Sequence, residues 1–363
     1  MTKRLGRSAF AFATPPCIRS NACVAGKKEG EGPLGNSFDI VNSDTSFGEK
    51  SWEKAESRMQ ELVLAKALSK ASLSPPDIDM IFAGDLLNQC IGSAFALKDS
   101  QIPFFGLYGA CSTCAEGLLL ASIAVTHGVF DHCAAVTSSH YCAAERQYRS
   151  PIEYGGQRPP TAQWTVTGSG AFILGSVTHA DARACAVIRR GMPGRVIEKG
   201  IRDANNMGAA MAPAAEDTLV RFFRATATKP SDYDLIVTGD LGYEGGEILC
   251  ELMRLSGYDL ADRYSDCGTR IYFREDQDVH GGGSGCGCSA VVLSAELLPK
   301  LLDGTWGRIL FLSTGAMMSP DSIKQGQSIP AVAHLLQIER SGAGHSDPDR
   351  VGASAPQAYK KGV

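Results

Sequence analysis

Cys111 is the residue of this chain best placed for covalent chemistry. The apolar run Ile102–Tyr108 predicts a strand, the small residues Gly109 and Ala110 permit a sharp turn, and an apolar helix is expected to begin at Cys111. The start of a helix carries a partial positive charge and free N–H groups, which favour a thiolate and lower the pKa of a thiol. This order of elements is a nucleophile elbow suited to acyl transfer. A buried, inert cysteine fits the same pattern, and both interpretations stay open.

Two cysteine pairs raise the question of redox or metal chemistry. Among the twelve cysteines, Cys111 and Cys114 have thioredoxin-like spacing, whereas Cys286 and Cys288 lie in a glycine-rich loop. A structural zinc site needs two Cys-x-x-Cys pairs, or one such pair with spaced histidines, so the second pair disfavours zinc. Most other cysteines are expected to be small buried residues. The sequence therefore predicts no cofactor.

Covalent acyl chemistry would also need a general base and an oxyanion site. His140 follows a predicted strand and is the best placed histidine. His280 precedes the loop Gly281–Cys286, whose backbone N–H groups could bind an anion. Either imidazole could equally be ordinary, the first hydrogen-bonded at a strand end and the second exposed in a loop.

Other charged residues suggest ligand or cation binding. Asp85 and Asp240 each follow an apolar strand, where a carboxylate either caps the next turn or contacts a ligand. Two carboxylates with backbone carbonyls would suit Ca²⁺. Arg146 and Arg149, in the polar segment 144–157, could clamp carboxylates or form salt bridges at an interface.

An internal repeat predicts the architecture. Asp77–Leu86 matches Asp232–Leu241 at six of ten positions, and each copy is a short apolar strand preceded by a helical segment and a proline. Alternating strands and helices with continuously apolar strands predict parallel-rich sheets covered by helices on both faces. Ligands bind beyond the carboxyl ends of strands in such sheets, so Asp85, Asp240 and Cys111 are expected near one site on a pseudo-twofold axis.

The same repeat divides the chain. The predicted halves are residues 1–180 and 181–340, and residues 341–363, which lack apolar periodicity, are expected to be a flexible tail. The further strands predicted in the two halves are 133–137, 168–174, 308–313 and 331–338.

Composition excludes several classes of function. The chain has 363 residues, of which 44% are hydrophobic and 20% charged, as in globular proteins. Its net charge of −4 offers no basic field for nucleic acid. The longest apolar stretch, Leu118–Val125, is far shorter than the roughly 20 residues of a membrane helix, and the N-terminus makes a poor signal peptide. The chain is predicted to be cytoplasmic and to reach a membrane only through partner proteins.

Several motifs taken together resemble the stage V sporulation protein AD family. The resemblance runs from near the N-terminus to about residue 340, and the combination is highly specific although each motif alone is not. The motifs are Gly84–Gln89, Gly109–Thr113, Thr137–His140, Ala144–Gln147, Glu153–Gln157, Met211–Ala215, Gly239–Leu241 and Gly282–Cys286.

The resemblance implies a fold and a function. The implied fold is the thiolase-like α/β fold, a duplicated five-layer αβαβα arrangement that is similar to condensing enzymes of fatty-acid synthesis, and a homodimer is the common state of that superfamily. The family binds dipicolinic acid (pyridine-2,6-dicarboxylic acid), alone or as its calcium chelate. It assists uptake of that acid into the developing spore with membrane proteins of the same operon. The chain would then associate with the forespore membrane through those partners.

Differences from the condensing enzymes indicate that this chain has lost the condensation reaction. Cys111 matches the nucleophile position of the superfamily. Condensing enzymes place a histidine where this chain has Thr238–Asp240, and an asparagine or second histidine where Gly282–Ser284 provides neither. Loss of donors to a developing oxyanion costs several powers of ten in rate. The sequence therefore suggests a retained pocket without the condensation reaction.

Three functional hypotheses follow. The favoured one is a dipicolinate-binding component of a transport complex, with donors for the carboxylates and, if calcium accompanies the ligand, aspartates for the cation. An acyltransferase using Cys111 and a structural subunit that binds no small molecule are the alternatives. The residues expected to bind the ligand are Asp85, Cys111, Ser112, His140, Arg146, Asp240 and Ser284.

Overall fold

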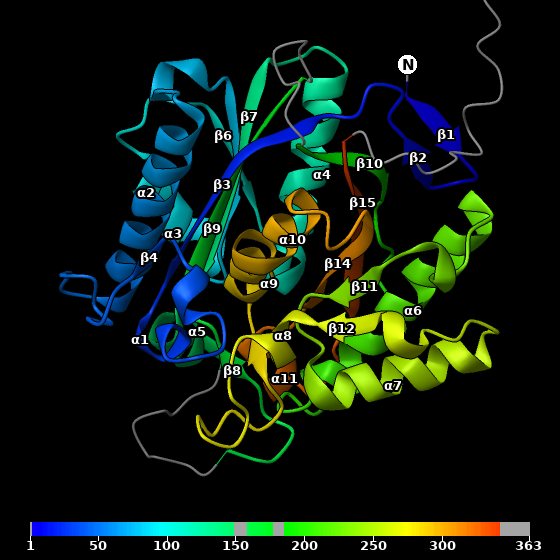
Figure 1. The fold of residues 1–363 in the computed structure, drawn as a ribbon. Helices are drawn as coiled ribbons and strands as arrows, with labels where there is room; N and C mark the ends of the chain where they lie inside the picture. The colour runs from blue at the N-terminus through cyan, green and yellow to red at the C-terminus, as the bar shows by residue number, and fades with distance from the viewer. Residues whose placement is uncertain (1, 149–157, 177–184, 342–363) are drawn as a thin grey trace, which may run out of the picture.

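The computed structural model describes residues 2–148, 158–176 and 185–341, which form five layers (Figure 1). Outer helices, a sheet, inner helices, a second sheet and further outer helices follow one another across the molecule. This arrangement is the αβαβα fold predicted from the repeat and the resemblance. Of the predicted tail, 341–363, all but Ser341 lies outside the described residues.

The first sheet carries the first copy of the repeat. Its strands are hydrogen-bonded in the order β3-β9-β7-β5-β6. β5 runs parallel to β6 and β7, whereas β9 runs antiparallel to β7 and β3. The bounds are β3 (Cys17–Ala25), β5 (Met80–Gly84), β6 (Phe104–Leu107), β7 (His132–Ser139) and β9 (Gly168–Gly175).

The second sheet repeats that order strand for strand. Its strands follow as β10-β15-β14-β11-β12, again with one antiparallel strand between two others. The equivalence of β5 with β11 is the one that the sequence repeat predicts. The bounds are β10 (Ala186–Met192), β11 (Leu235–Thr238), β12 (Tyr264–Asp266), β14 (Arg308–Ala316) and β15 (Ala331–Arg340).

The repeated aspartates explain part of the sequence match. The Asp79 carboxylate accepts two consecutive backbone N–H groups at the start of β7, and the Asp234 carboxylate accepts two at the start of β14. Each half thus uses the same carboxylate to fix the beginning of its central strand.

The two sheets are joined at one edge. A two-residue pairing of β10 with β3 makes them one hydrogen-bonded sheet of thirteen strands. The N-terminal hairpin of β1 (Lys3–Leu5) and β2 (Ala9–Ala11) pairs with β10 and so lies with the second half. β4 (Ile40–Val41) pairs with β3. The predicted boundary at residue 180 falls within 177–184, outside the described residues.

Helices form the other three layers (Figure 1). The outer helix α2 begins after Ser51, whose side chain accepts the Lys54 N–H, and its apolar face packs on β3 and β9. The inner helix α4 packs on β7 and β14, so it touches both sheets. The bounds are α2 (Trp52–Ala71), α3 (Ile91–Leu97), α4 (Thr113–Thr126), α6 (Met207–Thr226), α7 (Gly242–Leu255), α9 (Cys286–Val292) and α10 (Leu298–Leu302).

Short elements connect the halves near the carboxyl ends of the strands. β8 (Trp164–Thr165) pairs in parallel with β13 (Gly283–Ser284), which brings the end of the first half beside the glycine-rich loop. The remaining short helices are α1 (Lys27–Gly30), α5 (Tyr141–Tyr148), α8 (Cys267–Arg270) and α11 (Pro320–Lys324).

Two predicted elements begin later in the chain than expected. β6 is shorter than the predicted strand and starts only after Pro103, which has no N–H to give to a neighbouring strand. The helix expected from Cys111 begins as a 3₁₀ turn, Ala110–Ser112, and becomes α-helical at Thr113.

Candidate functional site

Cys111 lies in a tight turn where the two halves meet. The preceding residue, Ala110, has φ of 50°, a left-handed conformation that non-glycine residues rarely adopt. Gly315 of β14 passes so close that a Cβ atom on it would lie 2.6 Å from the Gly109 carbonyl oxygen. Only glycine fits there, so the central strand of the second half packs directly on the turn that presents Cys111.

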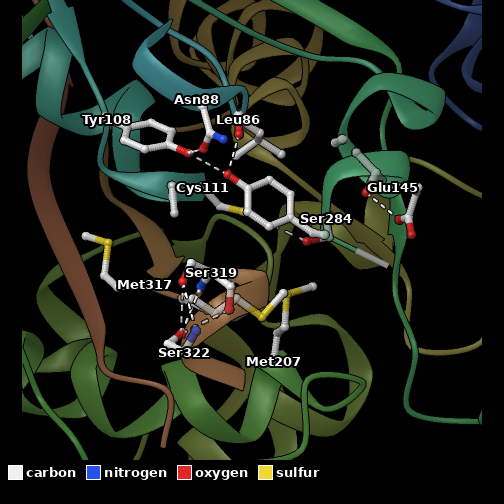
Figure 2. Close-up of a pocket in the computed structure, with 16 residues that line it drawn as sticks. Leu86, Asn88, Tyr108, Cys111, Glu145, Met207, Ser284, Met317, Ser319 and Ser322 are labelled. Carbon is white, nitrogen blue, oxygen red and sulfur yellow. Dashed lines mark hydrogen bonds between the residues drawn. The ribbon is translucent and has the colours of Figure 1, made fainter. Parts of the chain in front are cut away.

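A cavity of about 440 Å³ opens beside Cys111 (Figure 2). Its walls come from the turns that follow β5 and β6, from α5, from β8 and β13, and from the start of α6 and the end of β14. The lining residues are Leu86, Asn88, Tyr108, Ala110, Cys111, Ala144, Glu145, Tyr148, Thr165, Met207, Ser284, Ala316, Met317, Met318, Ser319 and Ser322.

Two tyrosines form one wall of the cavity. The Tyr108 and Tyr148 hydroxyl oxygens are 2.6 Å apart. The Tyr148 hydroxyl donates to the Leu86 carbonyl oxygen at 2.5 Å, and the Tyr108 hydroxyl donates to Asn88 Oδ1 at 3.0 Å. Burial raises the pKa of Tyr148, so its phenol stays protonated. Figure 2 shows Tyr108, Asn88 and Leu86 gathered on this side.

The opposite wall combines apolar methionine side chains with serine hydroxyl groups. Met207 and Met317 lie across from the tyrosine side in Figure 2, with Ser319 and Ser322 between them. Methionine side chains are flexible and polarisable and adapt to the shape of a bound ring. This wall therefore offers packing surface and neutral donors.

The charge on the lining is acidic. Glu145 lines the cavity and its Oε1 accepts a hydrogen bond of 2.7 Å from Thr165 Oγ1. Within the described part of the chain, no lysine, arginine or histidine lines the cavity. Arg149, one of the predicted carboxylate clamps, lies outside the described residues.

Asp240 lies directly behind Ser284. The Asp240 carboxylate is buried and accepts from Ser284 Oγ at 2.9 Å, from the Gly285 N–H at 3.0 Å and from Thr314 Oγ1 at 2.8 Å. Cys111 Sγ is 4.0 Å from Ser284 Oγ, which lines the cavity beside it. The thiol therefore faces a buried carboxylate and a serine that already donates to that carboxylate.

This environment keeps Cys111 protonated. Burial raises the pKa of the Cys111 thiol well above its usual value, and the charge of Asp240 and a hydrogen bond to that carboxylate raise it further. The prediction of a lowered thiol pKa was wrong, because burial beside a carboxylate outweighs the partial charge of a helix start. The elbow geometry is present, but the thiolate is disfavoured.

Asp85 supports the cavity wall from behind. Its carboxylate is fully buried and accepts from the Leu87 N–H at 2.9 Å, from the Ser93 N–H at 2.7 Å and from Ser93 Oγ at 2.6 Å. These bonds fix the turn that carries Leu86 and Asn88 into the cavity. Asp85 itself is absent from the lining formed by the described residues.

Three other predicted residues lie away from the lining. His140 is buried and its Nε2 is 2.8 Å from the Thr45 carbonyl oxygen. Arg146 is half exposed and forms an ion pair with Glu53. Ser112 is buried and its Oγ donates to a backbone carbonyl oxygen within its own turn.

The structure thus brings two predicted residues, Cys111 and Ser284, to the cavity surface. The tyrosines, the methionines and Glu145 were not predicted from the sequence. One signal was available in α5, because Ala144 and Tyr148 are one helical turn apart and share a face. The methionines come from distant segments, and no local pattern marks them.

The described residues hold no group of three or more His, Cys, Asp or Glu side chains that could bind a metal ion. Cys114, the proposed redox partner of Cys111, is a free buried thiol whose surroundings are Thr137, Ser289 and Ser313. No helix in residues 2–148, 158–176 or 185–341 is long and apolar enough to cross a membrane.

Solved structures of other proteins share this fold. A variant of OleA from Xanthomonas campestris superposes with a TM-score of 0.56 at 14% identity, covering 91% of this chain and 99% of that one. The 3-oxoacyl-[acyl-carrier-protein] synthase III of Aquifex aeolicus VF5 gives a TM-score of 0.54 at 12% identity, covering 89% and 99%. These likenesses confirm the thiolase-like α/β fold.

Sequence relatives are more specific. The family model described as Stage V sporulation protein AD matches residues 6–339. The protein of that name from Bacillus subtilis (strain 168) is 42% identical over 340 residues, which cover 94% of this chain and 99% of the relative. The family model and the relative both match almost the whole length of this chain. The chain therefore belongs to the stage V sporulation protein AD family.

Proposed function

We propose that this chain binds dipicolinic acid, as its calcium chelate, in the cavity beside Cys111. In this role it assists uptake of the acid into the developing spore together with membrane proteins. The observation that carries the proposal is a cavity of small-molecule size, with aromatic and hydroxyl walls, in a chain whose family is named for sporulation. The family resemblance supplies the identity of the ligand.

The cavity suits a small flat ring. Its volume of about 440 Å³ lies in the range of small-molecule pockets. Tyr108 and Tyr148 offer faces for stacking, and aromatic pairs prefer offset or edge-to-face contacts. Ser319 and Ser322, which are bonded to each other, place hydroxyl groups on the lining that can turn to donate to carboxylate oxygens.

Charge favours the chelate over the free dianion. Burial of a dianion needs cationic or N–H partners, and the described lining residues include no cationic side chain. Calcium neutralises both carboxylates of the ligand, so the chelate enters without net charge. Ca²⁺ takes six to eight ligands, mainly oxygens. Glu145 and Asn88 place a carboxylate and an amide oxygen on the lining, the groups that calcium prefers.

A calorimetric titration tests this proposal. We expect saturable one-to-one binding of dipicolinic acid in the presence of calcium and weaker binding when a chelator removes the calcium. Isophthalic acid has the same shape without the ring nitrogen, and picolinic acid lacks one carboxylate. Each should bind at least about tenfold more weakly, since one lost contact to a charged group is worth about 1.5 kcal/mol or more. No heat with any ligand, or equal affinity for all three, would refute the proposal.

The position of Cys111 makes acyl transfer the competing function. Burial and Asp240 raise the thiol pKa, and this direction opposes a nucleophilic role. We therefore expect no mass shift on the intact protein after incubation with acyl-CoA of several chain lengths. An acyl adduct mapped to Cys111 would favour the acyltransferase instead.

We further infer that two copies of the chain pair through β6. This strand is an edge of the sheet, and its residues Phe104 and Phe105 are exposed, as are Ile91 and Phe95 in the preceding helix α3. The equivalent edge in the second half, β12, is half-buried and ends in a buried aspartate. An exposed apolar edge strand pairs readily with another edge, and a second copy offers the complementary one.

Analytical sedimentation measures the oligomeric state and so tests this inference. The wild-type chain should be a dimer at micromolar concentration, and Phe105→Lys should be a monomer because the charge would be buried at the pairing edge. Leu255→Lys, at an exposed apolar position on α7, is the matched control and should remain dimeric. A monomeric wild type would contradict the inference.

A further inference from the structure

A group of buried polar side chains lies behind the cavity wall, where α2, α3 and the ends of β5 and β7 meet. Gln60 Nε2 donates to Ser93 Oγ at 2.9 Å and to Ser138 Oγ at 2.7 Å. Ser93 Oγ donates to Asp85, and Ser138 Oγ donates to Glu56 Oε1 at 2.9 Å. All five side chains are fully buried. One amide therefore links two carboxyl groups through two serines.

Two atoms in this group lack a hydrogen-bond partner among the described residues. They are Glu56 Oε2 and Gln60 Oε1. Glu56 and Gln60 are one turn apart on α2 and so are neighbours on its face. With an ionised Glu56, both atoms would be buried acceptors without a donor.

The geometry identifies which of the two carboxyl groups is charged. Asp85 receives three hydrogen bonds from N–H and O–H donors, as an ionised carboxylate requires. Glu56 receives one, from Ser138. Two negative charges in one buried network disfavour each other. Burial, and then the charge of Asp85, raise the pKa of Glu56 well above its usual value, although the bond from Ser138 lowers it.

We propose that Glu56 is protonated at neutral pH and that its proton completes this network as a donor to Gln60 Oε1. Glu56 is then a positioning residue, because the network ends on Asp85, which fixes the turn carrying Leu86 and Asn88 into the cavity. This role does not depend on which ligand the cavity takes.

A proton fits this place better than a metal ion. The oxygens of Asp85 are occupied by protein donors, so a cation would find one carboxylate and one amide oxygen. The thiol of Cys286, whose Sγ donates to the Ser138 carbonyl oxygen, is a further titratable group close to Glu56. The Glu53–Arg146 ion pair lies outside, one turn earlier on α2.

The proposal predicts how stability depends on pH. A carboxyl group whose pKa is raised on folding keeps a proton that the unfolded chain releases. Stability from Glu56 is therefore fully present below about pH 4.5, the usual pKa of a glutamate, and is lost as the pH rises through the folded-state pKa. Within this window the folding equilibrium constant falls up to tenfold per pH unit.

Glu56→Gln tests the proposal, because glutamine has the shape of the protonated acid and supplies N–H donors at every pH. Urea unfolding should show that wild-type stability falls more steeply than that of Glu56→Gln between pH 5 and pH 9. Glu61→Gln, at an exposed carboxyl of the same helix paired with Arg58, should keep the wild-type slope. Equal slopes for wild type and Glu56→Gln would overturn the proposal.

Two further measurements distinguish a protonated Glu56 from a Glu56 that contributes to stability only by packing. Hydrogen exchange at the Leu87 and Ser93 amides, which bond to Asp85, should accelerate with pH beyond the intrinsic rate in wild type, but not in Glu56→Gln. The infrared difference between the two proteins at neutral pH should contain one protonated carboxyl band. A carboxylate band in its place would show that Glu56 is ionised and would overturn the proposal, whatever the stability of the variant.

Discussion

Asp85 and Asp240 occupy equivalent strand ends in the two halves but interact with different partners. Asp85 binds donors of its own half and fixes the turn behind the cavity wall. Asp240 accepts from Ser284 and Gly285 in the glycine-rich loop and faces Cys111 of the other half. The two halves therefore hold similar buried carboxylates with different roles. Asp85 supports the cavity wall, and Asp240 is an acidic neighbour of the Cys111 thiol.

The strands that neighbour these aspartates show the same divergence. In the second half, Thr314 of β14 donates to Asp240 directly. By the register of the two sheets its counterpart is Ser138 of β7, which donates to Glu56 instead. A glutamate on α2 and a glutamine one turn later thus extend the first-half site into a buried network. Equivalent backbone positions therefore do not imply equivalent chemistry.

Removal of the supporting carboxylate should have the largest effect. Asp85→Ala leaves two backbone N–H groups and the Ser93 hydroxyl buried without their acceptor. Each unsatisfied group costs about 1–3 kcal/mol, so we expect a loss of about 3 kcal/mol or more in the free energy of unfolding. Urea unfolding measures this loss. Asp99→Ala, at an exposed aspartate, is the control and should change stability by less than about 0.5 kcal/mol.

The second aspartate should control the thiol. Asp240→Asn removes the charge that raises the pKa of Cys111, so alkylation of Cys111 by iodoacetamide at pH 8 should accelerate about tenfold for each unit by which that pKa falls. Peptide mass mapping resolves the twelve cysteines. Asp85→Asn should leave the Cys111 rate unchanged. If both variants altered the rate alike, the proposed division of roles would fail.

Ser284 links Asp240 to the cavity. Ser284→Ala removes one hydrogen bond to the buried carboxylate and one hydroxyl from the lining. We expect a loss of about 1 kcal/mol in stability and a comparable loss in the affinity for dipicolinic acid with calcium. Urea unfolding and calorimetry measure the two losses. Undiminished affinity would place the ligand away from the glycine-rich loop.

The smallest effect should come from Arg146. Its ion pair with Glu53 is half exposed, and such pairs contribute about 0–1 kcal/mol. Arg146→Ala should therefore leave both stability and dipicolinate affinity nearly unchanged in the same two assays. A tenfold weaker affinity would instead support the ligand-clamp role that the sequence suggested for this residue.

Much of the fold was predictable because it rests on local patterns. The repeated apolar strand with its Gly-Asp-Leu end located β5 and β11 and, through them, the pseudo-symmetry. The turn before Cys111 was predictable because small residues precede an apolar helix. The N-terminal hairpin was not, because its pairing with β10 joins segments far apart in the chain.

The candidate site was less predictable. Cys111, in the turn after β6, and Ser284, at the end of β13, both line the cavity, and their positions follow from local sequence patterns. The Cys111 pKa was mispredicted because the helix start is visible in the sequence, whereas burial beside Asp240 arises only when the two halves pack. Nothing near Glu56 in sequence signals its partner Asp85, since they meet across two elements of the first half.

If the ligand enters the cavity beside Cys111, it should protect this cysteine from alkylation. Alkylation of Cys111 at pH 9 should slow at least about tenfold when dipicolinic acid and calcium saturate the protein, because a ring in the cavity covers the thiol. Cys250, half-buried on α7 and absent from the cavity lining, is the internal control and should react at its usual rate. An unchanged Cys111 rate at saturating ligand would contradict the account and place the ligand elsewhere.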